Sequence, residues 1–134
     1  EAAVQILKGQ EFVPMDSVER IVTRDELIGL QDKARTLSVH DSIFDYIVTL
    51  VEATRESELF SMGASPRGAN ALLRMSRAMA VLSGREYVVP GDIAEVFNDV
   101  LGHRVKLAAR ARANGMTVAE ALDEVRSQVK VPRT

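Results

Sequence analysis

Apolar residues recur at helical spacing along much of this chain, most clearly over residues 41–57. The residues that share one side of that segment are Ile43, Ile47, Leu50, Val51 and Thr54. Asp41 and Asp45 add negative charge to its first turns, where the helix dipole favours it. The pattern predicts an amphipathic helix with one buried face.

Further helices are predicted where start and stop signals frame similar patterns. Thr23-x-x-Glu26 and Thr117-x-x-Glu120 have the form of capping boxes, in which the two side chains satisfy free backbone donors. The other predicted helices are 2–8, 66–83 (ending at Gly84) and 90–101. Extended pieces are expected at 86–89 and 105–107, and loops at 57–63 and 108–116. The sequence predicts an all-α fold, a small bundle of about five helices with short extended connections.

Composition excludes several classes of function. The 134 residues suit one domain, and 17 basic against 19 acidic residues give a net charge of −2, without a general attraction for nucleic acid. There is no cysteine, only two histidines, and no apolar run long enough to span a membrane. No catalytic constellation is apparent. The opening EAAVQILKGQ lacks Met and a signal-peptide layout, so we expect a cut within a longer chain or a processed end.

The stretch GASPRGAN, residues 63–70, has two glycines spaced as in the phosphate-binding P-loop. The lysine and hydroxyl residue that should follow are replaced by Ala69 and Asn70, so the P-loop pattern fails. Ser65 is instead a suitable helix N-cap and Pro66 a suitable first helical residue. The stretch is therefore predicted to begin a helix.

Arg67 would be the second residue of that helix. An exposed cation at the positive end of a helix dipole destabilises the helix by about 0.3–1 kcal/mol. An anion held there would make the interaction with the dipole favourable. The residues alone leave two interpretations open, an anion-binding helix start or an arginine turned into water. Arg74 and Arg77 lie on the same side of this helix as Arg67. That side is interpreted as a solvated face, a subunit contact or a phosphate-binding groove.

Several spaced motifs together resemble the C-terminal lid domain of MoxR-type AAA+ ATPases. They are Gly63-Ala64-Ser65-Pro66-Arg67, Gly84-Arg85, Tyr87-Val88, Pro90, Asp92-Ile93, Val100-Leu101 and His103-Arg104. The turn at 39–41, the pairs Tyr46-Ile47 and Thr54-Arg55, and the closing TVAEALDEV are also similar, so the resemblance covers nearly the whole chain. Val89 departs from it, because the family often has a capping Thr there.

The resemblance implies a single helical lid domain over 1–134, with 1–16 as the first lid helix and linker and the ATPase core absent. Arg67 would be the sensor-2 arginine that reaches the phosphates of ATP, with Ser65 as the helix N-cap and Arg55 as a further nucleotide-binding candidate. ATP and Mg²⁺ would be bound mainly by the missing core, so this fragment alone should not hydrolyse ATP and should hold no cofactor or metal.

The resemblance also implies partners. The partners would be the lid's own ATPase core, the neighbouring subunits of a hexameric ring, and a von Willebrand factor A domain protein. The whole assembly would be a chaperone-like machine in the cytoplasm. It would bind no nucleic acid and would not span a membrane. The alternative is a free-standing helical interaction or nucleic-acid-binding module that uses the arginine-lined helix. A P-loop encoded upstream of Glu1 would distinguish the first interpretation from the second.

Overall fold

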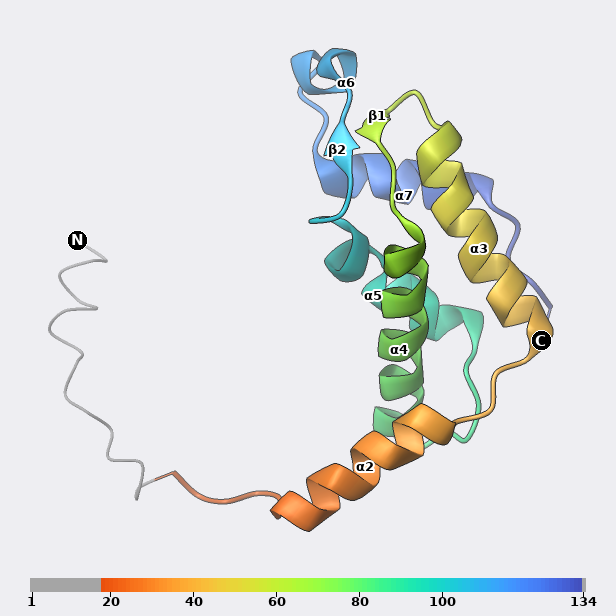
Figure 1. The fold of residues 1–134 in the computed structure, drawn as a ribbon. Coiled ribbons are helices and arrows are strands. Elements are labelled where there is room, and N and C mark those ends of the chain that lie inside the picture. The colour runs from red at the N-terminus through yellow and green to blue at the C-terminus, as the bar shows by residue number, and fades with distance from the viewer. Residues whose placement is uncertain (1–17, 134) are drawn as a thin grey trace, which may run out of the picture.

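The computed structural model describes residues 18–133, and the helix predicted over 2–8, with the linker assigned to 1–16, lies outside them. The helices are α2 (Arg24–Thr36), α3 (Asp41–Glu56), α4 (Pro66–Leu82), α5 (Pro90–Leu101), α6 (Ala109–Ala113) and α7 (Val118–Gln128). The strands are β1 (Phe60–Met62) and β2 (Lys106–Leu107). Figure 1 shows α3, α4, α5 and α7 packed together, with α2 across one end of α4 and the small sheet at the other. The predicted all-α fold is confirmed.

The two predicted capping boxes and the predicted helix end at Gly84 have the expected chemistry. Both capping boxes form, with the backbone N–H of Glu26 and of Glu120 each 3.2 Å from the threonine hydroxyl three residues before it. At the end of α4, Gly84 has a φ of 70°. Its N–H donates to the carbonyl of Val81, and the next N–H, that of Arg85, donates to Ala80. This is the Schellman motif that a left-handed glycine makes possible.

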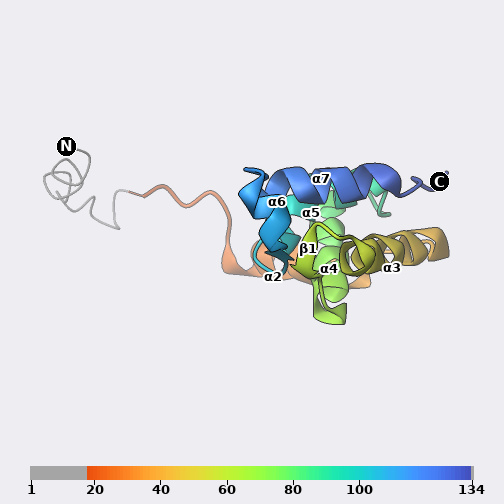
Figure 2. The same cartoon turned by 90° about the horizontal axis from the view of Figure 1, so that it is seen from above.

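The core lies between α3, α4, α5 and α7. The predicted apolar side of α3 is buried, with Ile43 and Leu50 at 0% exposure. Leu72 of α4 and Phe97 of α5 are also completely buried, and among the described elements these two helices share the most extensive contact. Figure 2, seen from above, shows α7 running along one side of this group. Burial of these side chains is the main stabilising term of the fold.

Two predicted loops were wrong. Residues 57–63 contain β1, in which Phe60 is buried and pairs antiparallel with Leu107 of β2. Residues 108–116 contain the short helix α6, which is anchored by the buried Ala111. Both elements depend on neighbours that are far away in the sequence or on a single small apolar residue, so local periodicity could not reveal them.

The connection between α4 and α5 is fixed by a buried carboxylate. Asp92, with 2% of its side chain exposed, accepts hydrogen bonds from both terminal nitrogens of Arg85, one of them at 2.7 Å. Its Oδ2 also accepts from the backbone N–H of Val89 at 2.9 Å, which satisfies the helix start where the residue before Pro90 cannot act as a cap. The hydrogen bond to Asp92 raises the pKa of Arg85 above its ordinary value.

We expect the Glu120 capping box to make stability depend on pH. Hydrogen bonds from the Thr117 backbone and hydroxyl lower the pKa of Glu120 below its usual 4.5. The stabilisation is therefore complete above that value and is lost as the pH falls through the lowered folded-state pKa. Glu120→Gln should flatten the decline in melting temperature between about pH 5 and about pH 3. Glu124→Gln, an exposed change on the same helix, should leave the decline as it is; equal slopes for both variants would contradict the prediction.

Candidate functional site

The start of α4 is held against the end of α3 by a buried threonine. Thr54, at 0% exposure, donates its hydroxyl proton to the carbonyl of Val51 at 2.7 Å. The same oxygen accepts the backbone N–H of Ala64 at 2.9 Å, and Ala64 is itself completely buried. One side chain thus joins the last turn of α3 to the loop that leads into α4.

Gly63 allows the loop to approach α3 this closely. A Cβ at this position would lie 2.5 Å from the Cα of Arg55 and 2.6 Å from the carbonyl oxygen of Thr54. Both are backbone atoms that cannot move aside without distorting α3. Gly63 is not among the glycines with positive φ, so glycine is needed here for space.

Helix α4 begins at the predicted residue, but the predicted capping hydrogen bond is not formed. Ser65 occupies the N-cap position, but its hydroxyl makes no capping hydrogen bond. Pro66 is the first helical residue, and the N–H of Gly68 is satisfied by the Ser65 carbonyl at 2.7 Å. Arg67 is exposed, and within residues 18–133 no hydrogen bond or ion pair involves its side chain. The guanidinium and the Ser65 hydroxyl are thus available to a ligand.

Arginine side chains border the start of α4, and its first turn holds no acidic residue. The first turn of α4 has no acidic residue, whereas α2, α3, α5 and α7 each have at least one. The Cγ of Arg55 lies against Gly63, and the Cδ of Arg104 would be 3.8 Å from a Cβ on Gly68. Arg104 is half-buried, with its Nε donating to the Val100 carbonyl at 3.0 Å. The structure therefore places Arg55 beside the loop that precedes Ser65 and Arg67, and adds Arg104 beside Gly68, the residue after Arg67.

Three contributors to this place were missed at the level of sequence. The spacing places Thr54 on a buried face, and the resemblance includes Thr54, Gly63 and Arg104 in its motifs, but neither indicates what these three residues do at the start of α4. A threonine on an otherwise apolar helical face is a usable signal, because a buried hydroxyl needs a partner. The contacts of Gly63 and Arg104 connect segments that are distant in the sequence.

The arrangement suits an anion more than a cation. A helix N-terminus with an available guanidinium matches phosphate oxygens in charge and geometry. No group of three or more His, Cys, Asp or Glu side chains within residues 18–133 could hold a metal ion. None of the helices in this described part is long and apolar enough to cross a membrane.

Comparison with known proteins identifies the same region. The family model of the AAA lid domain matches residues 52–125, which include Thr54, Arg67 and Arg104. The chain is 35% identical over 119 residues to the protein YeaC of Bacillus subtilis, covering 89% of this chain and 37% of that protein. It is 34% identical over 124 residues to the chaperone MoxR1 of Mycobacterium tuberculosis, covering 86% of this chain and 33% of that protein.

Two further similarities agree with this family assignment. The protein MoxR of Methylorubrum extorquens is 36% identical over 107 residues, covering 69% of this chain and 31% of that protein. A crystal structure from Cytophaga hutchinsonii, of a protein assigned as an ATPase, superposes with a TM-score of 0.79 at 28% identity, covering 98% of this chain and 42% of that one. The chain spans about a third of the length of the curated relatives it matches.

Proposed function

This chain belongs to the AAA lid domain family and is a lid of the MoxR-like AAA+ type, and from that premise we propose that it senses the nucleotide of its parent ATPase through Arg67. The observation that carries the proposal is the start of α4. Arg67, which has no side-chain partner among residues 18–133, lies in a first turn without acidic residues, and the loop before that turn is fixed to α3 by Thr54 and Gly63. The family assignment favours this function over a free-standing nucleic-acid module.

The residues present fit a phosphate group. The Arg67 guanidinium and the Ser65 hydroxyl can donate to phosphate oxygens, and the dipole of α4 favours their charge. ATP, when bound, supplies the phosphoryl group, and Mg²⁺ would be bound by the ATPase core, since the described residues contain no cluster of metal ligands. Arg67 would orient the phosphates and couple their presence to the position of the lid. Arg55 and Arg104 would add positive charge beside it.

The activity of the parent follows as part of the same proposal. The parent would couple ATP hydrolysis to chaperone-like remodelling or maturation of partner proteins, in keeping with the name of the Mycobacterium tuberculosis relative. It would act in the cytoplasm as a ring, of six subunits by the family resemblance, with a von Willebrand factor A domain protein among its partners. The lid alone would not hydrolyse ATP.

The test is Arg67→Ala in the full-length parent. We expect ATP turnover to fall about tenfold to a hundredfold, because a charge-assisted contact to the reacting phosphates is lost. Arg67→Lys should recover only part of this loss, since lysine lacks the forked guanidinium. Steady-state ATPase assays, with the melting temperature as a check on folding, measure the effect.

Arg110→Ala is the matched control, because Arg110 is also exposed but lies on α6. It should keep both turnover and melting temperature. Unchanged turnover in Arg67→Ala, or an equal loss in Arg110→Ala, would remove Arg67 from the mechanism.

A further inference from the structure

A second basic feature lies between α2 and α4, away from the start of α4. A hollow of about 480 Å³ is lined by Gln31, Ala34, Arg35, Arg74 and Arg77. None of these residues is acidic, although the whole chain has a net charge of −2. Two helices that are distant in sequence therefore bring three arginines to one concave surface, which we name the arginine hollow.

The arginine hollow is distinct from the Arg67 site. At a rise of 1.5 Å per residue, Arg74 and Arg77 lie roughly 10–15 Å along α4 from Arg67. Figure 1 shows α2 meeting α4 at the end opposite β1, whereas Arg67 belongs to the turn next to β1. A single phosphate group held by Arg67 could not also occupy the arginine hollow.

The arginines of the hollow have unused hydrogen-bonding capacity. Arg77 donates from a terminal nitrogen to the Arg35 carbonyl at the end of α2, at 3.3 Å, but its Nε is buried without a partner among the described residues. Arg35 has one exposed contact, to Asp32 at 3.3 Å. Arg74 is exposed and makes no side-chain hydrogen bond within residues 18–133. Carboxylates are suitable partners, because each can accept two parallel bonds from a guanidinium.

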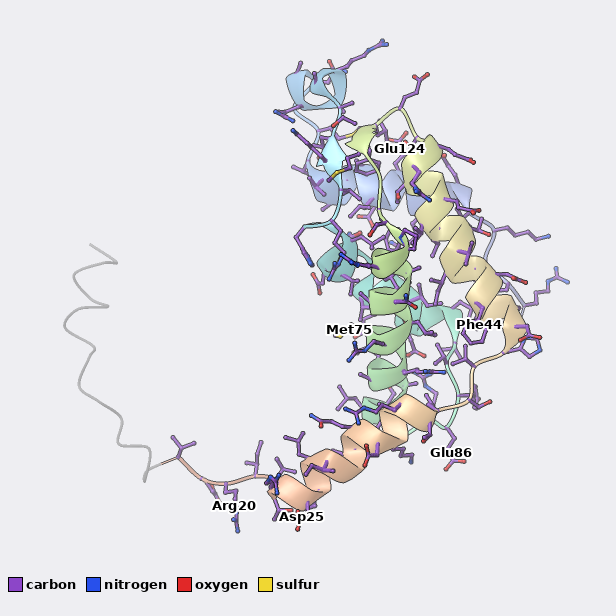
Figure 3. The ribbon with its side chains drawn as sticks, viewed as in Figure 1. Arg20, Asp25, Phe44, Met75, Glu86 and Glu124 are labelled. Atoms are coloured by element: carbon purple, nitrogen blue, oxygen red, sulfur yellow. The ribbon has the colours of Figure 1, made fainter. Side chains whose placement is uncertain are left out.

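The surface beside the arginine hollow is apolar, and no described residue covers it. Helix α2 has no buried residue, and Leu27 and Leu30 are 47% and 43% exposed on the face that Ala34 shares. Figure 3 shows Met75, the neighbour of Arg74 in sequence, on the flank of α4 opposite α3. Its side chain is 45% exposed. The arginine hollow and its surroundings therefore expose basic and apolar side chains next to one another.

We propose that the arginine hollow binds an acidic, amphipathic segment of polypeptide. Carboxylates of that segment would pair with Arg35, Arg74 and Arg77, and its apolar side chains would cover Leu27 and Leu30. We choose an acidic partner because its negative charge complements the three arginines of the hollow. Single-stranded nucleic acid fits less well, because the lining contains no aromatic side chain on which bases could stack. The proposal does not depend on the role of Arg67.

The test uses this chain and a short end-blocked peptide of alternating Glu-Glu and Leu-Leu pairs. Binding is followed by fluorescence anisotropy of the labelled peptide and by NMR shifts of the arginine Nε–H groups. We expect saturable binding that weakens with salt, and no binding of the peptide in which Lys replaces Glu. Arg74→Glu should weaken binding about tenfold, and Arg35→Gln, on the other helix, should also weaken it.

Arg110→Glu makes the same charge change outside the hollow and should leave the affinity unchanged, as should Arg67→Ala. Melting temperatures check that each variant is folded. Equal affinity in Arg74→Glu and Arg110→Glu, or equal binding of the Lys peptide, would overturn the proposal. Tighter binding of a single-stranded oligonucleotide that Arg74→Glu abolishes would overturn it in favour of nucleic acid.

Discussion

Gly63→Ala is expected to lower the free energy of unfolding by about 3 kcal/mol, although it adds one methyl group. The new Cβ would lie 2.5 Å from the Cα of Arg55 and 2.6 Å from the Thr54 carbonyl oxygen, so either the loop or the end of α3 must move. Movement of the loop would break the bond from the Ala64 N–H to Thr54 and displace Arg67. Urea unfolding of the chain measures the stability, and ATPase assays of the full-length parent should show a loss like that of Arg67→Ala.

Gly29→Ala is the control for this change, because it should have the opposite sign. Nothing lies within 4 Å of a Cβ at Gly29, in the middle of α2, so alanine should stabilise the helix by roughly 0.5–1 kcal/mol. A loss of less than about 0.5 kcal/mol in Gly63→Ala, the usual range for a surface change, would mean that the close approach is not needed.

Asp92→Ala is the second change with a large expected effect, a loss of about 3 kcal/mol. The substitution leaves Arg85 without its carboxylate and the backbone N–H of Val89 without an acceptor, at a site where Asp92 is 2% exposed. The Arg85 side chain is 28% exposed and can turn partly into water, which keeps the loss at the lower end of the range for broken buried pairs. Denaturant unfolding measures it.

Asp99→Ala removes an exposed carboxylate from the same helix and should change stability by less than about 0.5 kcal/mol. Asp92→Asn separates charge from shape, since it keeps the size of the side chain but weakens the pairing with Arg85. The order of stability should be Asp99→Ala, then Asp92→Asn, then Asp92→Ala. Equal values for Asp99→Ala and Asp92→Ala would show that the pair does not fix the α4–α5 connection.

Much of the fold could be predicted because the signals that specify a helix lie within a few residues of one another in the sequence. The buried face of α3 follows from its spacing, and the capping boxes at Thr23 and Thr117 form as the residues indicate. The arginine at the start of α4 could also be recognised, because Pro66 fixes the helical register. These features depend on residues within a few positions of one another, so the sequence alone determines them.

The surroundings of Arg67 required the tertiary structure. The capping role expected of the Ser65 hydroxyl is absent, and the loop is instead held by Thr54, which lies ten residues before its partner Ala64, on another helix. The pairing of β1 with β2 joins Phe60 and Leu107, which no local pattern connects. Such contacts are set by which helices pack together.

The sequence by itself determined that this chain forms helices and that one helix begins with a cation at its positive end. Only the tertiary structure decided what surrounds that cation, namely the glycine against α3, the buried threonine hydroxyl and the half-buried Arg104. It also decided that α2 meets α4 to form the arginine hollow. The physical reason is that helix formation depends on neighbours along the chain, whereas close packing and hydrogen bonding of buried groups depend on neighbours in space.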